Sequence, residues 1–354
     1  MMSKRRGTAT GGAVTVSGSL RRGIMRVCAV LLIGLVASAA APAARAPLNF
    51  VPWRADHHVH LRSRALYDAW DALCRKLKEQ DCARPDPDKA VVSADSAIAA
   101  LDSVGARKGV VLSGAYQFGS PFVADEHYDV GAKSRAENEF VASEVARVPT
   151  RLIGFFSVAP LDPTAASEVT YWAADGRLKG LKLHLANSKI DLRDAAQVRK
   201  VADIVRLAAQ HQLPIVIHVK GQNFTPQDAE TFIRDVMPAA GNQWVQIAHV
   251  GGWGGYDAAT AEVLKTWATH FANHDPAVRH VLFDLAYVVR PSMTPEEATG
   301  LAAQMRGIGL ARFVLGSDFD SETPRATDEL GRTKLPLTNA EWRRVASNCA
   351  PWAC

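Results

Sequence analysis

Three histidines lie in the segment Ala-Asp-His-His-Val-His-Leu, residues 55–61, and two of them, His58 and His60, are separated by one residue. Successive side chains of a β-strand point to opposite faces, so Asp56, His58 and His60 would share one face and His57 would point the other way. Two neutral imidazoles side by side on a strand can bind one cation, because imidazole nitrogen is a good ligand for zinc and similar metals. The spacing therefore indicates part of a metal site, with His57 in a structural role.

Four further polar residues close short apolar segments. His184 ends Gly-Leu-Lys-Leu-His, His218 ends Pro-Ile-Val-Ile-His, His249 ends Val-Gln-Ile-Ala-His, and Asp318 ends Phe-Val-Leu-Gly-Ser-Asp. If these segments are parallel strands of one barrel, their carboxyl ends converge on the mouth where such enzymes keep their active sites. The pattern as a whole therefore predicts a bound metal at that mouth.

Eight such segments alternate with helical patterns between residues 47 and 354. The expected strands are 55–61, 108–115, 151–158, 180–185, 214–219, 244–250, 281–287 and 312–318, and the expected helices include 93–104, 135–147, 193–211 and 226–237. Thr225, Thr294 and Thr338 are candidate N-caps of three helices. The count favours an α/β fold of the (β/α)8 TIM-barrel type, with residues 62–91 inserted after the first strand. An open doubly wound sheet is the alternative, although no Gly-x-Gly-x-x-Gly sequence follows an early strand.

These residues resemble the amidohydrolase superfamily, specifically the amidohydrolase-2 (amidohydrolase-related) family. The resemblance spans nearly all of residues 55–350 and rests on Asp56-x-His58-x-His60, Gly180-Leu181-Lys182-Leu183-His184, His218, His249-x-Gly251-Gly252 and Gly316-Ser317-Asp318. It implies that one divalent metal, with zinc as the first candidate, is bound by His58, His60, His218 and Asp318. It also implies that His249 acts beside the metal as an acid–base or carbonyl-polarising residue.

The fourth expected strand carries a further choice. In binuclear relatives a lysine on this strand is carbamylated and bridges two metals. Lys182 and His184 share one face, so either could enter the site as a ligand of a second metal or as a contact of the substrate. A buried salt bridge or a contact with a substrate carboxylate is the preferred interpretation of Lys182.

The resemblance leaves three functions open. The primary hypothesis is hydrolysis of an amide, ester or lactone of a small molecule by metal-activated water, with Asp318 taking the proton and His249 stabilising the oxyanion. The alternative is non-oxidative, metal-dependent decarboxylation of a small aromatic carboxylic acid. There Asp318 or His249 would protonate carbon and Arg290 would hold the acid, unless Arg290 is only a solvated loop cation. The third is a barrel that binds a ligand without catalysis.

Several other residues follow the expected strands at the mouth. The candidates for the wall of a substrate pocket are Tyr116, Asn187, Trp253 and Tyr256, although ordinary loop packing is an equal interpretation for each. Asp284 lies within the seventh expected strand, where a buried hydrogen bond that organises the barrel is the favoured role.

Residues 1–46 read as a separate leader. They hold seven basic residues and no acid, and since the net charge of the chain is +5, the remaining 308 residues carry −2. A basic flank, the short apolar run of residues 27–41 and Ala-x-Ala sites are typical of a secretory signal peptide, which predicts a bacterial periplasmic or secreted protein. The net charge of −2 in residues 47–354 argues against a nucleic-acid-binding face. No membrane role is expected after removal of the leader. A homo-oligomer is left open.

Four cysteines lie outside the leader, at positions 74, 82, 349 and 354. They allow three pairings. The two short-range disulfides, Cys74–Cys82 and Cys349–Cys354, fit an oxidising compartment, and free thiols are the alternative.

Overall fold

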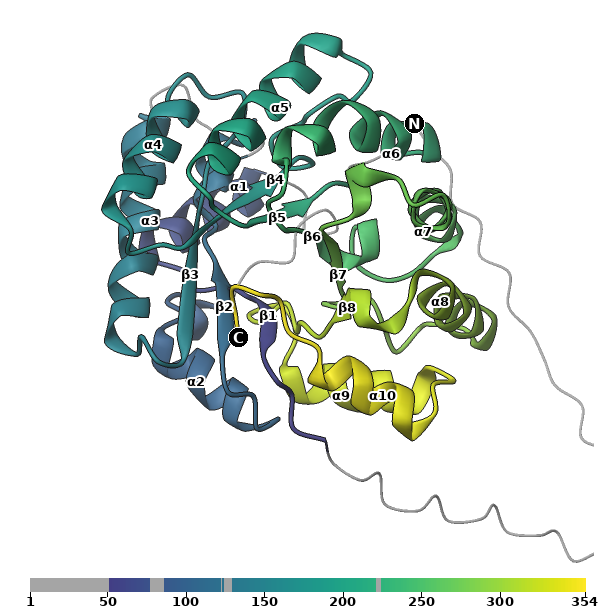
Figure 1. Ribbon diagram of the computed structural model, residues 1–354. Coiled ribbons are helices and arrows are strands. Elements are labelled where there is room, and N and C mark those ends of the chain that lie inside the picture. The colour runs from purple at the N-terminus through teal and green to yellow at the C-terminus, as the bar shows by residue number, and fades with distance from the viewer. Residues whose placement is uncertain (1–50, 77–85, 122, 124–128, 221–223) are drawn as a thin grey trace, which may run out of the picture. The chain divides into compact units, whose positions relative to one another are not determined.

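Eight short strands run parallel to one another in the order of the chain (Figure 1). They are β1 Asp56–Val59, β2 Gly109–Leu112, β3 Leu152–Ser157, β4 Gly180–His184, β5 Ile215–His218, β6 Val245–Ile247, β7 Val281–Asp284 and β8 Phe313–Val314. The computed structural model describes residues 51–76, 86–121, 123, 129–220 and 224–354. All eight expected strands are therefore present, each at its expected place.

The barrel closes between its first and last strands. His57 N–H donates to the carbonyl of Leu315 at 3.0 Å, and Asp318 N–H donates to the carbonyl of His58 at 2.9 Å. A parallel bridge between Val59 and Phe319 continues this pairing. The ladder confirms the (β/α)8 barrel and excludes the open doubly wound sheet, in which the two edge strands would stay apart.

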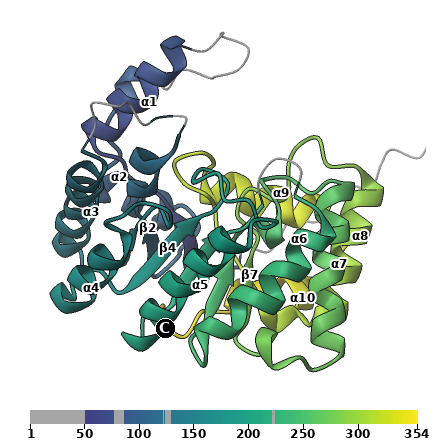
Figure 2. The ribbon, with the colours of Figure 1, turned by 90° about the horizontal axis from the view of Figure 1, so that it is seen from above.

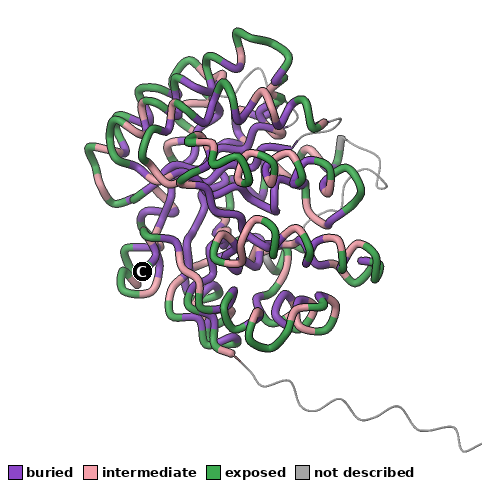
Figure 3. The backbone as a smooth tube through the Cα atoms, turned by 45° about the vertical axis from the view of Figure 1, so that its right-hand side comes forward, coloured by how far each residue is buried: buried purple, intermediate pink, exposed green. Residues whose placement is uncertain are grey.

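Helices follow the strands on the outside of the barrel (Figures 1 and 2). They are α1 Arg64–Lys76, α2 Ala94–Asp102, α3 Val130–Arg147, α4 Ala165–Asp175, α5 Ala195–Gln210, α6 Pro226–Thr231, α7 Ala258–Ala272, α8 Pro295–Ile308, α9 Pro324–Lys334 and α10 Asn339–Ser347. The expected caps at Thr225, Thr294 and Thr338 each form a reciprocal capping box with the acid three residues later. Buried backbone lies in the strands and exposed backbone on the outer helices (Figure 3).

The expected helix 226–237 is divided into three parts. The α-helical part ends at Thr231, a π-helical turn covers Phe232–Val236, and a 3-10 turn covers Met237–Ala240. Pro238 has no backbone N–H to donate to the preceding turn, which accounts for the irregular end.

Two strands end earlier than expected. β6 stops at Ile247, and the chain then forms the 3-10 turn Ala248–Gly251, in which His249 and Val250 have φ of 53° and 51°. β8 stops at Val314, and Asp318 has φ of 65°. The expected bounds 244–250 and 312–318 are therefore too long, and the site residues His249 and Asp318 have left-handed backbone beyond the ends of these strands.

The insertion after β1 contains the helix α1. Its base is closed by an antiparallel bridge, in which Arg62 and Val92 exchange backbone hydrogen bonds of 3.1 and 2.9 Å. Figure 2 shows α1 extending outward beyond α2. Cys74 of α1 is disulfide-bonded, but its expected partner Cys82 lies among residues 77–85, outside the described part of the chain.

The C-terminal segment returns to the barrel strands. Cys349 and Cys354 form a disulfide, and between them Ala350 N–H donates to Nε2 of His57 at 3.0 Å. The expected leader, residues 1–46, lies outside the described residues. Among the described helices, none is long and apolar enough to cross a bilayer.

Candidate metal centre and substrate pocket

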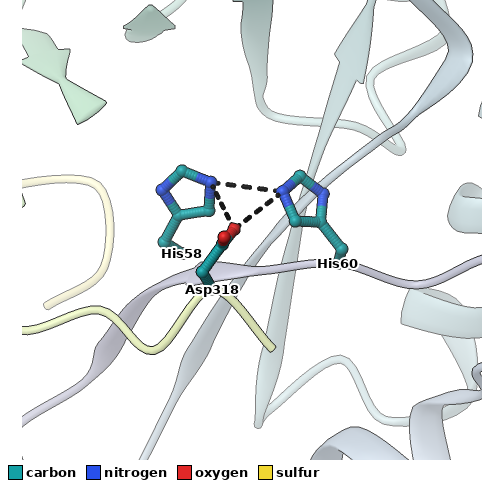
Figure 4. Close-up of side chains that lie close together, drawn as sticks. All are labelled: His58, His60 and Asp318. Atoms are coloured by element: carbon teal, nitrogen blue, oxygen red, sulfur yellow. Dashed lines mark hydrogen bonds and ion pairs between the residues drawn. The ribbon is translucent and has the colours of Figure 1, made fainter. Parts of the chain in front are cut away.

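Three side chains meet where β1 and the segment after β8 lie side by side: His58 within β1, His60 just after it, and Asp318 after β8 (Figure 4). The Nε2 atoms of His58 and His60 are 3.2 Å apart. Oδ1 of Asp318 lies 3.3 Å from the first and 3.4 Å from the second. A tetrahedral metal with bonds of about 2.1 Å holds its donor atoms about 3.4 Å apart, so this triangle has the size that a divalent ion requires.

Hydrogen bonds on the far side of both imidazoles fix which nitrogen faces the triangle. Nδ1–H of His60 donates to the carbonyl of Leu112 at 2.7 Å, and Nδ1–H of His58 donates to Oδ2 of Asp284 at 3.0 Å. Each Nε2 therefore keeps its lone pair for a ligand. Metal-binding histidines almost always have such an outer partner, which orients the ring and raises its basicity. The residues present thus fit a divalent metal.

Burial keeps the His58 ring neutral. Burial lowers the pKa of His58 well below 6.5, and the nearby charge of Lys182 lowers it further, while Asp318 acts in the opposite sense. Burial alone would raise the pKa of the Asp318 carboxyl, but its contacts with His60, His58 and His249 hold that pKa well below its usual range. Neutral imidazoles around a carboxylate are the protonation states in which all three groups can bind a cation.

Asp56 supports Asp318 rather than joining the triangle. Its carboxylate accepts hydrogen bonds from the hydroxyl of Ser317 at 2.6 Å, from the Ser317 backbone at 3.0 Å and from the His58 backbone at 3.1 Å. Burial raises the pKa of Asp56 to about 7, although the hydrogen bonds lower it. Asp56 therefore joins β1 to the segment that carries Asp318.

Asp284 is the most connected polar residue of the site. Besides His58, its carboxylate accepts hydrogen bonds from the Gln246 side chain at 2.6 Å and from the backbone N–H groups of His249 at 2.8 Å and Ala286 at 3.2 Å. The sequence indicated a structural hydrogen bond here, but it did not show that Asp284 orients a metal ligand. His58, His249 and Asp284 also lie within metal-binding distance of one another. We interpret this group as hydrogen-bonded support, since the Asp284 oxygens already have four donors.

His249 is held by a strained turn. Nδ1–H of His249 donates to the carbonyl of Ala286 at 2.7 Å, and its ring centroid is 4.8 Å from that of His58. The left-handed φ of 53° at His249 is followed by 51° at Val250, where a buried β-branched side chain disfavours it. Strain of this kind is concentrated at functional sites. The turn leaves Nε2 of His249 without a partner in the described chain, on the wall of the cavity.

His218 does not lie with the other three expected metal ligands. Its Nε2–H donates to the carbonyl of Lys220 at 3.1 Å. Within the described residues, its nitrogens do not join those of His58, His60 and Asp318 inside the 4.8 Å that defines the cluster. His218 does line the same cavity, so its assignment as a fourth ligand stays a prediction.

The two polar residues of β4 face the cavity. Lys182 is only 1% exposed, and burial lowers its pKa to about 8, while Asp284 and Asp318 oppose the shift. The ring of His184 stacks on His218, with centroids 3.9 Å apart and planes 12° apart. Burial, followed by the charge of Lys182, lowers the pKa of His184 well below 6.5.

A cavity of about 390 Å³ opens above these groups. Its wall includes three of the four candidates from the sequence, Tyr116, Asn187 and Trp253, together with Leu66 and Trp70 of α1 and Tyr287. Tyr256 is not on this wall, and its hydroxyl donates to Oε1 of Gln304 at 3.0 Å. Trp253 is 50% exposed. The insertion therefore forms one side of the cavity, and aromatic rings form much of the remainder.

Arg290 is not on the cavity wall. Its guanidinium lies 3.5 Å from the centroid of the Tyr287 ring. In this cation–π contact the guanidinium charge lies against the face of the Tyr287 ring. The expected role of Arg290 as a direct clamp for an acidic substrate is therefore not supported, because its charge is used in packing.

Solved structures with the same fold include several decarboxylases. One is 5-carboxyvanillate decarboxylase from Sphingomonas paucimobilis, with a TM-score of 0.56 and 16% identity, covering 84% of this chain and 96% of that chain. Another is 5-carboxyvanillate decarboxylase from Novosphingobium aromaticivorans DSM 12444 with bound manganese, with a TM-score of 0.57, 14% identity and coverages of 84% and 95%. A third is dihydroxybenzoic acid decarboxylase from Polaromonas sp. JS666 with bound manganese and 2-nitroresorcinol, with a TM-score of 0.54, 15% identity and coverages of 84% and 95%.

Identities this low show the shared fold and nothing finer. No curated protein matches the sequence. A family model gives the stronger result: residues 55–326, about three quarters of the chain, match Amidohydro_2, described as Amidohydrolase. The matched residues include all three members of the metal cluster, His58, His60 and Asp318. The chain therefore belongs to this amidohydrolase family.

Proposed function

We propose that this protein is a metal-dependent, non-oxidative decarboxylase of a small aromatic carboxylic acid. The observation that carries the proposal is the triangle of His58, His60 and Asp318 at one end of a cavity with aromatic walls. The decarboxylases of similar fold support this reaction over hydrolysis, which the sequence alone favoured.

His58, His60 and Asp318 would hold the metal. A divalent ion bound there acts as a Lewis acid that polarises a substrate oxygen. Manganese is present in two of the similar structures, whereas zinc is the first candidate from the sequence. Two imidazoles and a carboxylate suit both ions, and metal analysis of the purified protein distinguishes them.

The aromatic walls would orient the ring of the substrate, and His249 would supply the proton. Its Nδ1–H is held by Ala286, which leaves Nε2 to carry a proton on the cavity side. Nε2–H transfers this proton to the ring carbon that bears the carboxylate. The carbon–carboxylate bond then breaks, its electron pair restores the aromatic ring, and CO2 leaves. His249 regains its proton from solvent.

Hydrolysis of an amide, ester or lactone is the second candidate. Asp318 favours it, because this carboxylate lies among the expected ligand atoms, where it can accept the proton of an attacking water. The two reactions differ in product: decarboxylation releases CO2, whereas hydrolysis creates a new carboxyl group and releases none.

The deciding experiment measures both products. Purified protein reconstituted with Mn²⁺ or Zn²⁺ is incubated with hydroxylated benzoates and, separately, with aryl esters, amides and lactones. We expect metal-dependent CO2 release from at least one benzoate. Acid release from the esters or lactones with no CO2 from any benzoate would favour hydrolysis. A protein that retains no stoichiometric metal would support a ligand-binding barrel.

We also propose that residues 1–46 are a cleaved export signal and that the protein acts in the periplasm or outside the cell. The basic flank and the apolar run of the leader support this. Mass spectrometry of the protein from a bacterial periplasmic fraction tests it, because an intact N-terminus on the mature chain would contradict cleavage.

A further inference from the structure

Two hydrogen-bond donors on β4 have no acceptor among the residues that the structure describes. The side chains of Leu181 and Leu183 pack in the hydrophobic core, so the alternation of the strand turns Lys182 and His184 into the barrel. Both line the cavity, and both are more than nine-tenths buried. Within the described residues, the Lys182 ammonium makes no hydrogen bond and has no carboxylate within 4.0 Å.

The local hydrogen bonds assign the tautomer of His184. The backbone N–H of Asn187 donates to Nδ1 of His184 at 3.2 Å, so Nδ1 is the acceptor and the ring proton is on Nε2. The ring is fixed between His218 and Tyr116, whose centroids are 3.9 and 4.8 Å from its own. Nε2–H of His184 is therefore a held donor without a partner in the described chain.

The cavity thus holds two sets of groups with opposite chemistry. His58 and His60 present lone pairs beside the Asp318 carboxylate, which suits a cation. Lys182 and His184 present hydrogens, which suit an anion. A buried ammonium is costly unless it is paired, so the missing acceptor should arrive with the ligand.

We propose that Lys182 and His184 bind an anionic oxygen group of the substrate that is distinct from the group at the metal cluster. This inference rests on the proposed function and names its substrate class: a small planar aromatic acid with two acidic oxygen groups. A cavity of about 390 Å³ admits one aromatic ring with such groups. Trp253, whose ring lies 6.0 Å from that of His184, would cover the ring of the substrate.

Binding of two simple probes tests the inference without turnover. The metal-loaded protein is titrated with benzoate and with benzene-1,3-dicarboxylate, with affinity followed by calorimetry. We expect the dicarboxylate to bind about tenfold or more tightly, as one additional charge-assisted hydrogen-bonded contact predicts. Equal affinities for the two probes would overturn the inference.

Substitutions test whether Lys182 and His184 cause the tighter binding of the dicarboxylate. Lys182→Met should remove most of the advantage of the dicarboxylate and leave the benzoate affinity within about threefold, and His184→Asn should reduce the advantage less. Lys179→Met removes an exposed lysine just before the same strand and should leave both affinities unchanged. Thermal unfolding and metal content are measured first, and Lys182→Arg, which keeps the charge, should retain part of the preference if Lys182→Met does not fold. Retention of the full preference by Lys182→Met would overturn the inference.

A carbamate on Lys182 would also overturn it, because the ammonium would no longer exist. Incubation with ¹³C-bicarbonate followed by NMR detects that carbon, and we expect no carbamate resonance. The failure of this inference is separable from failure of the proposed function. CO2 release without a dicarboxylate preference would contradict only the inference, whereas the preference without CO2 release from any acid would contradict only the decarboxylase proposal.

Discussion

Nδ1 of His58 lies 3.0 Å from Oδ2 of Asp284, and both side chains are completely enclosed by the barrel. This pair connects β1 to β7, and through the His249 backbone N–H it also reaches the turn after β6. One carboxylate thereby sets the direction of a metal ligand and of the proposed proton donor. The relationship makes Asp284 the support on which the geometry of the site depends.

Asp284→Asn should weaken metal binding while leaving the ligands in place. The amide can still accept from His249 through Oδ1, but its Nδ2 hydrogens would face the donors of His58 and Gln246. Loss of such an outer partner lowers metal affinity by about 10- to 100-fold. Titration of the metal-free protein with Mn²⁺ or Zn²⁺ measures this. Asp203→Asn, on the exposed face of α5, is the control, and equal affinities in the two variants would contradict the role of Asp284.

His249→Gln should separate catalysis from metal binding. The variant removes the Nε2 proton, so CO2 release should fall by about 10²- to 10⁴-fold, while the metal content should stay at the wild-type level. Asp318→Asn should differ in metal content, because it should lose the metal as well as the activity. Activity assays paired with elemental analysis distinguish the two variants. A His249→Gln protein with wild-type activity would remove His249 from the mechanism.

The sequence was enough to predict the barrel and the convergence of its polar strand ends. An apolar run that ends in a polar residue predicts both a strand and the strand end that lies at the mouth of the barrel, as at His184 and His218. The ends of β6 and β8 were placed too late because residue types alone do not show where the backbone leaves the ladder, and the buried Val250 gives no sign of its left-handed φ.

The support of the site could not be predicted from the residues alone. Asp284 and His58 are separated by 226 positions, and the direction of a carboxylate within a strand depends on which neighbouring strands offer donors. The same limit applies to His218. Its place at a strand end was correct, but the hydrogen bond that turns Nε2 toward Lys220 depends on the path of the following loop.

Gly316→Ala should destabilise the barrel beside the metal ligands. A Cβ at this position would lie 2.9 Å from Cβ of His58 and 3.2 Å from Cβ of Ala286. Neither neighbour is a flexible chain end, so β1 must move, at a cost of about 1–3 kcal/mol in unfolding free energy. Gly307→Ala, in α8 with open space around it, is the matched control and should stabilise by up to about 1 kcal/mol. Urea unfolding measures both variants. An unfolding free energy of Gly316→Ala equal to that of the wild type would show that β1 can move away from Gly316 without cost.

His57 should make the metal-free protein sensitive to acid. Burial lowers its pKa from 6.5 to about 4, and Nε2 must remain unprotonated to accept from Ala350. Since the folded pKa is below the unfolded one, the stabilisation is complete above pH 6.5 and is lost as the pH falls toward 4, by about 2 kcal/mol between pH 7 and pH 5. Urea unfolding in the presence of a chelator measures the loss. Glutamine at position 57 cannot titrate, so the loss of unfolding free energy between pH 7 and pH 5 should be smaller in His57→Gln than in the wild type, by about 2 kcal/mol. His211→Gln, at the exposed end of α5, is the control and should lose as much as the wild type. Equal losses in wild type and His57→Gln would assign the acid sensitivity to other groups.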